Sequence, residues 1–197
     1  MTAGDRRLVR EAVAAYFGGT MQTEDDGIYF QGGPLSSLGL GTAYPYKIKR
    51  GAPDQYYTLG ETDGTGWGAV LTVTLGPEKI TRQAMGGATS GFRSRHYTTY
   101  CALDIISYEP HLETTEAGVD DLIDAFLQLI YDDRTLGSTN AELYPNPPYP
   151  GNRLIVQAGE GREGIDVGEA TWTVDGDRGR GEGGLLITFD TFNSVMA

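Results

Sequence analysis

One glycine-rich run has the spacing of a phosphate-binding loop. Gly159, Gly161 and Gly164 match G-x-G-x-x-G, which in dinucleotide-binding proteins opens a helix whose N-terminus faces the pyrophosphate. The residues that follow, IDVGEATWTV, are typical of a strand instead of a helix. No acidic residue stands about 20 residues further on in a second strand of a βαβ unit. The run therefore favours a loop between two strands, and a nucleotide-binding module is the weaker alternative.

The other residue types that could do chemistry stand apart from one another. Asp175-Gly176-Asp177-Arg178-Gly179 resembles the start of a calcium loop but lacks the third ligand position and the distal glutamate, which favours a hairpin turn. His96 and His111 have no cysteine or carboxylate cluster at ligand spacing, and no nucleophile motif surrounds the single cysteine, Cys101. We therefore expect no catalytic residue, metal site or cofactor, and predict that the protein is not an enzyme.

The hydrophobic period changes between residues 93 and 137. Residues 97–108 are rich in Tyr, Thr and Ile, which favours a strand with apolar side chains on both faces, and Pro110 ends it. Thr114 or Thr115 is then expected to cap a helix that stops at Gly137. A strand that feeds an amphipathic helix predicts a helix lying on a sheet. The apolar stripe of this helix is Val119, Leu122, Ile123, Phe126, Leu127 and Ile130.

The residues before this stretch predict one helix and few strands. Asp5–Phe17 has helical spacing and stops at Gly18-Gly19, and its Arg6, Arg7 and Arg10 are expected to face solvent. Thr20–Gly41 is expected to be a loop in which Ile28–Phe30 is briefly extended. Tyr44–Arg50 alternates like an edge strand, because Pro45 and the basic residues suit an edge.

A long hairpin is expected in the middle of the chain and a meander at its end. Strands at Trp67–Leu75 and Lys79–Met85, joined by a turn at Gly76–Glu78, lead to a glycine-rich tip at 86–91. A proline-rich crossing loop at Asn140–Gly151 precedes strands at 153–158, 170–174 and 185–192. Residues 1–197 are thus predicted to form one α+β domain. Its mostly antiparallel sheet packs against one or two helices, with a projecting hairpin arm at about 79–96.

The formal net charge of the 197-residue chain is -12, and the charge is polarised along the sequence. Such a surface repels nucleic acid. Lys79, Arg82, Arg93 and Arg95 bracket the hairpin tip, whereas residues 96–133 contain nine acids and no lysine or arginine. No apolar run reaches 18 residues and the N-terminus has no signal-peptide core, so neither a membrane nor a secreted protein is expected.

The order of these elements resembles one protein family. A first helix, a long hairpin, the strand HYTTYCALDIISYE, an acidic amphipathic helix, the run Tyr131–Ser138 and a closing meander resemble the tail terminator (tail completion) proteins of long-tailed bacteriophages. The resemblance implies a structural protein of the virion, in the tail-neck region, assembled in the host cytoplasm. It implies a homo-oligomer, a hexameric ring, that caps the tail tube protein and meets the head-tail connector protein while DNA passes through without specific binding.

Within such a ring the polarised charges predict a contact between subunits or with the tube. Subunits repeat head to tail, so a basic patch on one copy meets an acidic patch on the next. Another neck protein, a head-tail connector or a stopper, is the alternative that shares a ring. The residues expected at the contact are Arg82, Arg93, Arg95 and Lys79 on the arm, and Glu113, Glu116, Asp120 and Asp124 on the acidic helix.

Overall fold

The structure, a computed structural model, describes residues 5–24, 27–46, 66–84, 91–109, 112–137, 155–158, 164–175 and 180–196. These residues form two α-helices, one short 3-10 helix and a nine-stranded sheet. The elements are α1 (Asp5–Gly18), β1 (Gly19–Glu24), β2 (Gly27–Gly32), η1 (Ser36–Leu38), β3 (Leu40–Tyr44), β4 (Trp67–Ala84), β5 (Gly91–Ser107), α2 (Leu112–Asp132), β6 (Ile155–Ala158), β7 (Ile165–Val167), β8 (Thr171–Asp175) and β9 (Arg180–Met196).

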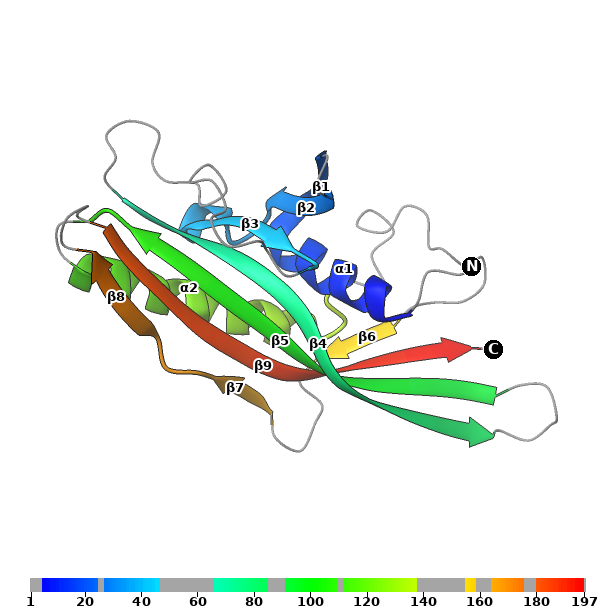
Figure 1. Ribbon diagram of the computed structural model, residues 1–197. Helices are drawn as coiled ribbons and strands as arrows, with labels where there is room; N and C mark the ends of the chain where they lie inside the picture. The colour runs from blue at the N-terminus through cyan, green and yellow to red at the C-terminus, as the bar shows by residue number, and fades with distance from the viewer. Residues whose placement is uncertain are drawn as a thin grey trace.

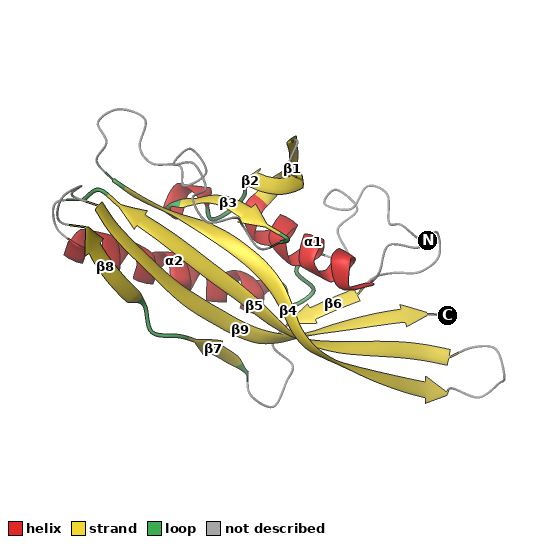
Figure 2. Cartoon of the chain, in the orientation of Figure 1, coloured by secondary structure: helices red, strands yellow, loops and turns green. Residues whose placement is uncertain are grey.

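The sheet is organised around three long strands. Its order is β1-β2-β3-β4-β5-β9-β6, and β7 and β8 pair with β9 beside β6. Each described pair is antiparallel except β3 with β4. Figure 1 and Figure 2 show α1 and α2 lying on the same side of this sheet. The predicted α+β class, a mostly antiparallel sheet packed against two helices, is therefore confirmed.

The core fills the space between the sheet and the two helices. The register puts Leu71 of β4, Leu103 of β5 and Leu185 of β9 in one row, and all three side chains are buried. Strand residues at every second position continue this face, because successive side chains of a strand alternate. The predicted stripe of α2 covers it. Val119, Leu122, Phe126 and Ile130 are buried, and Ile123 and Leu127 are half-buried.

The two helices are fixed to each other by aromatic contacts. The rings of Phe17 and Phe126 stack, with centroids 3.8 Å apart and an interplanar angle of 13°. The Tyr16 hydroxyl donates a hydrogen bond to the main-chain oxygen of Leu129 over 2.8 Å. Burial, followed by the nearby charge of Asp133, raises the pKa of Tyr16 to about 12, so this donor stays protonated at neutral pH. The packing therefore sets how α1 and α2 sit over the sheet.

Within the region predicted as a loop, 20–41, residues 20–24, 27–32 and 40–41 belong to the sheet, and Ile28–Phe30 among them was expected to be extended. β1 pairs with β2 along its whole length, and β3 lies between β2 and β4 and pairs with both. The predicted edge strand at 44–50 is also wrong over its described part. β3 ends at Tyr44 and lies between two strands, and residues 47–50 lie outside the described residues. The chain reverses from α1 into β1 at Gly19, whose φ of 91° favours glycine.

The predicted ends of the second helix need correction. α2 begins at Leu112, so Thr114 and Thr115 lie within it and neither is the cap. The buried Thr115 hydroxyl instead lies 2.6 Å from the hydroxyl of Ser107 at the end of β5. α2 ends at Asp132, five residues before Gly137. The turn that follows is held by Asp133.

Tertiary packing explains a glycine inside α2. A Cβ atom at Gly118 would lie 2.6 Å from Cζ2 of Trp67, the first residue of β4. A Cβ at Gly39 would lie 2.8 Å from Cη2 of the same ring. The indole is thus wedged between η1 and α2, and both glycines make room for it.

Candidate interaction surface

Three long strands continue together past the helices and form a projecting arm (Figure 1). We define the arm as residues 78–84 of β4, 91–97 of β5 and 191–196 of β9, with β6 paired along β9. A two-stranded hairpin was predicted here. The structure adds β9 and β6, and the predicted tip at 86–91 lies outside the described residues except for Gly91. The arm is therefore a small sheet with two faces and two edges.

The arm begins at a β-bulge, where a turn was predicted. β4 runs unbroken through Gly76 and Pro77, and its register with β5 shifts between Leu75, opposite Thr99, and Glu78, opposite Tyr97. A proline is accepted at a bulge because its missing N–H leaves no ladder bond unmade there. Pairing on both sides of the irregularity outweighs the local turn signal. A bulge also bends its strand, so it sets the direction in which the arm leaves the body.

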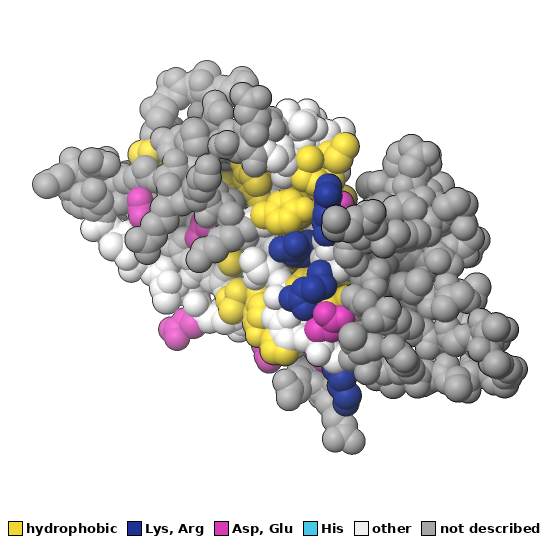
Figure 3. Space-filling view, turned by 45° about the vertical axis from the view of Figure 1, so that its right-hand side comes forward, with side chains coloured by type: hydrophobic (Ala, Val, Ile, Leu, Met, Phe, Trp, Pro, Cys, Tyr) yellow, Lys and Arg dark blue, Asp and Glu magenta, His cyan; other side chains and the backbone are white. Residues whose placement is uncertain are grey.

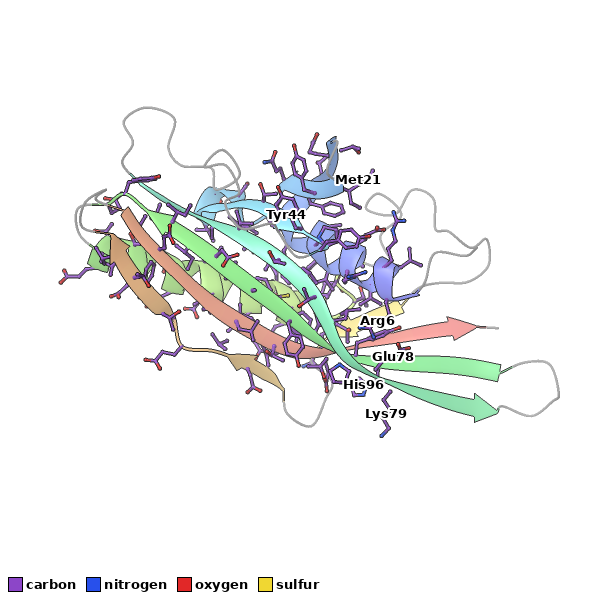
Figure 4. All side chains as sticks on the ribbon, viewed as in Figure 1. Arg6, Met21, Tyr44, Glu78, Lys79 and His96 are labelled. Carbon is purple, nitrogen blue, oxygen red and sulfur yellow. The ribbon has the colours of Figure 1, made fainter. Side chains whose placement is uncertain are left out.

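Arg6 of α1 clamps this bulge. Its Nη2 atom donates to the main-chain oxygens of Leu75, over 3.0 Å, and of Gly76, over 3.1 Å. Its Nη1 atom lies 3.3 Å from Oε2 of Glu78, and its guanidinium lies over the ring of Tyr97. Figure 4 shows Arg6 and Glu78 together at the base of the arm. Arg6 was expected to face solvent; its side chain is 41% exposed, but its guanidinium also binds two main-chain carbonyls of β4.

The other two arginines of α1 differ in their surroundings. Arg7 makes an exposed ion pair with Glu11, one turn away, which fits the predicted solvent-facing role. The Arg10 guanidinium lies 4.7 Å from the centre of the Tyr46 ring, so it has a tertiary contact that the sequence did not predict. Figure 3 shows lysine and arginine side chains gathered in one strip on this side of the molecule.

The register divides the four basic positions of the arm into two sets. Arg82 is directly opposite Arg93, and Arg95 is two residues further along β5, so these three positions share one face. Lys79 is opposite His96, on the other face, and its side chain is exposed. The Nε2 atom of His96 lies 3.2 Å from Oδ2 of Asp190 on that face. The predicted basic patch is therefore three arginine positions, without Lys79.

The predicted acidic residues of α2 do form one exposed row. Glu113, Glu116, Asp120 and Asp124 follow each other at helical spacing, and all four side chains are exposed. α2 contains no lysine or arginine to balance them. Like charges four residues apart cost a helix about 0.2–0.5 kcal/mol per pair.

The remaining sequence candidates do not assemble into a site. The third glycine of the G-x-G-x-x-G run, Gly164, leads into the strand β7, so the helix that a dinucleotide needs is not formed there. Cys101 is fully buried, and burial raises the pKa of its thiol, which disfavours the reactive thiolate. β8 and β9 pair up to Asp175 and Arg180, as a hairpin requires. His111 and the loop 140–151 lie outside the described residues.

Two further observations concern the class of protein. Within the described ranges, no His, Cys, Asp and Glu side chains gather in a group of three or more that could bind a metal ion. Neither described helix has the length and apolarity needed to cross a membrane. No known protein-family model matches the chain, and no curated protein matches its sequence.

Proposed function

We propose that this protein is the ring-forming subunit of a phage tail terminator, which caps the completed tail tube and receives the head connector. The arm is the observation that carries the proposal. It extends a sheet beyond the two described helices and places three arginine positions on one of its faces (Figure 1). A projecting, basic element suits a subunit that must hold a neighbour or the tube.

The register of the arm supports a partner with negative charge. Like charges directly opposite each other in an antiparallel pair are unfavourable, and Arg82 stands opposite Arg93. An acidic surface placed against this face would relieve that repulsion. The exposed row on α2 has the required sign and is repeated in every copy. Arm and α2 are thus complementary between copies that follow each other head to tail.

The overall charge supports the passage of DNA. With a net charge of -12, a ring of these subunits would not hold the polyanion that moves through it. A head-tail connector or stopper would share both the ring and this charge. Its place in the assembly order separates it from a terminator, since a terminator joins a tail that has reached full length before heads are added.

The first experiment measures assembly of the purified chain by native mass spectrometry and negative-stain imaging. We expect rings that are lost when Arg82, Arg93 and Arg95 are all replaced by glutamate, while the far-UV circular dichroism of the variant stays unchanged. Two single variants form a matched pair. Arg93→Glu should weaken the ring, and Lys79→Glu, on the opposite face, should not.

A charge swap tests the partner. Introducing Asp120→Lys and Asp124→Lys into the triple variant should restore rings if α2 of the next copy is the acidic surface. Because exposed charge pairs are screened over about 8 Å at physiological ionic strength, wild-type rings should also weaken as salt rises. Rings that survive the triple change, together with tails that are capped and joined to heads normally, would show that the arm makes no such contact. A chain that forms no ring at any concentration would refute the proposed function.

A further inference from the structure

Two edges of the arm are open to pairing within the part of the chain that the structure describes. β3 pairs with β4 from Ala69 to Thr72, so beyond Thr72 no described strand lies beside the outer edge of β4. Arg6 binds two carbonyls of this edge at the bulge. β6 pairs with β9 on one side and with no described strand on the other. Such edges present N–H and C=O groups that another strand can bind.

The two edges lie at the same level of the arm. One row of partners runs from Glu78 through Tyr97 and Thr191 to Ala158. The row three residues away runs from Thr81 through Ser94 and Ser194 to Ile155. The four residues of β6 are therefore matched, across the arm, by the segment 78–81 of β4. Both edges offer a segment of the same length.

Strand direction makes the two edges compatible between copies. β4, β5, β9 and β6 alternate in direction, because each is antiparallel to the next. β6 is consequently antiparallel to β4. If a second copy is placed beside the first without being turned over, its β4 edge meets the first copy's β6 edge in antiparallel orientation. The contact uses a different surface on each partner, as a ring requires.

The main-chain bonds identify which amides of β4 point outward. The N–H of Ala69 donates to Gly39 on the outer side, and the oxygen of Leu75 accepts from Arg6 on that side. Residues of an antiparallel strand alternate in the side to which their N–H and C=O groups point. Because the bulge inserts one residue, the outward set continues at Glu78 and then at every second residue, Ile80 and Arg82.

The same reasoning applies to β6. The N–H of Gly168 donates to the oxygen of Leu186, so the even-numbered residues of β9 direct their main-chain groups away from β5. Ile155 and Gln157 are opposite such residues and are bonded to β9. Val156 and Ala158 therefore point outward. The outward main-chain groups of β6 and of β4 both occur at every second residue, so those of one copy can pair with those of the next.

We propose that β6 of one copy pairs antiparallel with β4 of the next, along residues 78–81, and so joins their sheets into one continuous sheet around the assembly. The inference rests on the ring of the proposed function and specifies how its subunits are joined. Pairing of this kind uses the edge of the arm. It leaves the face that carries the positions of Arg82, Arg93 and Arg95 available for an acidic surface.

Hydrogen exchange of the full-length chain tests the pairing directly. In the assembled state the amides of Ile80 and Val156 should exchange at least about tenfold more slowly than in the dissociated chain. Val174 of β8 supplies the control, because its N–H also points outward from an edge strand and its side chain is 64% exposed. Its exchange should be the same in both states.

Proline variants give a second measurement. Ile80→Pro and Val156→Pro each remove one outward N–H without removing a bond of the arm, and we expect each to reduce assembly at least tenfold. Val174→Pro should assemble like the wild type. If rings form but the Ile80 and Val156 amides in them still exchange rapidly, the proposed strand pairing is wrong, whereas the proposed ring-forming function stands. A wild-type chain that stays monomeric would overturn both. If a proline variant misfolds, the hydrogen exchange of the wild-type Ile80 and Val156 amides alone tests the pairing.

Discussion

Replacing Phe126 by alanine should cost about 3–5 kcal/mol of unfolding free energy, the range for deleting a buried phenylalanine ring. The residue is fully buried on the α2 stripe and stacks on Phe17 of α1. In a protein of this size each kcal/mol lowers the melting temperature by about 2–4 °C, so a loss of about 6–20 °C is expected. Tyr131, on the same helix but 60% exposed, is the control, and Tyr131→Ala should change the free energy by less than about 0.5 kcal/mol.

A double-mutant cycle isolates the stacking of the two rings. Because removing both rings could unfold a domain whose stability is about 5–15 kcal/mol, the cycle uses Phe17→Leu and Phe126→Leu, which keep most of the volume. The coupling free energy between the two changes should be about 0.5–1.5 kcal/mol, as for other aromatic pairs in contact. Denaturant titrations followed by circular dichroism provide all four values.

Two results would refute this reasoning. A loss below about 1 kcal/mol for Phe126→Ala would mean that the stripe of α2 is not packed against the sheet in solution. A coupling free energy within about 0.5 kcal/mol of zero would mean that the two rings do not act as a pair, because the effects of substitutions at independent sites are additive within about that margin. The second outcome would leave the burial of Phe126 unaffected and would remove the contact that fixes α1 relative to α2.

Two other predictions concern the arm and the turn after α2. Arg6→Ala should lower stability by about 1–2 kcal/mol, since half-exposed charged hydrogen bonds are worth less than buried ones, and should speed hydrogen exchange in residues 78–84; an equal effect from Arg7→Ala would contradict the clamp. Partial burial raises the pKa of the Asp133 carboxyl group, but hydrogen bonds from Thr135 and Gly137 outweigh burial and lower this pKa. The charged carboxylate therefore stabilises the folded protein fully above the ordinary pKa of about 3.9, and this stabilisation is lost as the pH falls through the lower pKa of the folded state. Asp133→Asn should therefore destabilise the protein clearly at pH 7 and little near pH 2, and a loss that is the same at both pH values would exclude the carboxylate as its cause.

The elements that the sequence predicts well are those whose side chains show a regular period. The stripe of α2 and the apolar residues of β5 mark their buried faces directly, because burial selects side-chain type at the period of the element. The helix α1 was predicted for the same reason. β1 was missed, since runs such as Gly19–Glu24 are polar and lack the apolar alternation that identifies a strand, and only Ile28–Phe30 of β2 was expected to be extended. β2 enters the sheet by pairing with β3, and β1 enters it by pairing with β2.

The parts of the candidate surface that the sequence does not predict depend on contacts between distant residues. β9 joins the arm through pairs such as Arg95 with Asn193, which are almost 100 positions apart. The role of Arg6 depends on carbonyls some 70 residues away. Glycine and proline at 76–77 are turn residues by local preference, and a bulge accepts the same pair. No local pattern distinguishes these outcomes, because the strand partner on each side decides between them.

Because of the bulge, the direction of the arm can change without a change in the pairing of its strands. Leu75 and Glu78 are three positions apart, yet both lie on the helix-facing side, because one residue between them is extra relative to β5. Deleting Pro77 would restore a regular ladder, and all the remaining residues of β4 would keep their partners on β5 and their face of the sheet. The arm would straighten while its chemistry stayed the same. The presence of one extra residue at the bulge thus sets the angle of the arm. Through this angle the diameter of an assembly could be changed without changing the residues that hold it together.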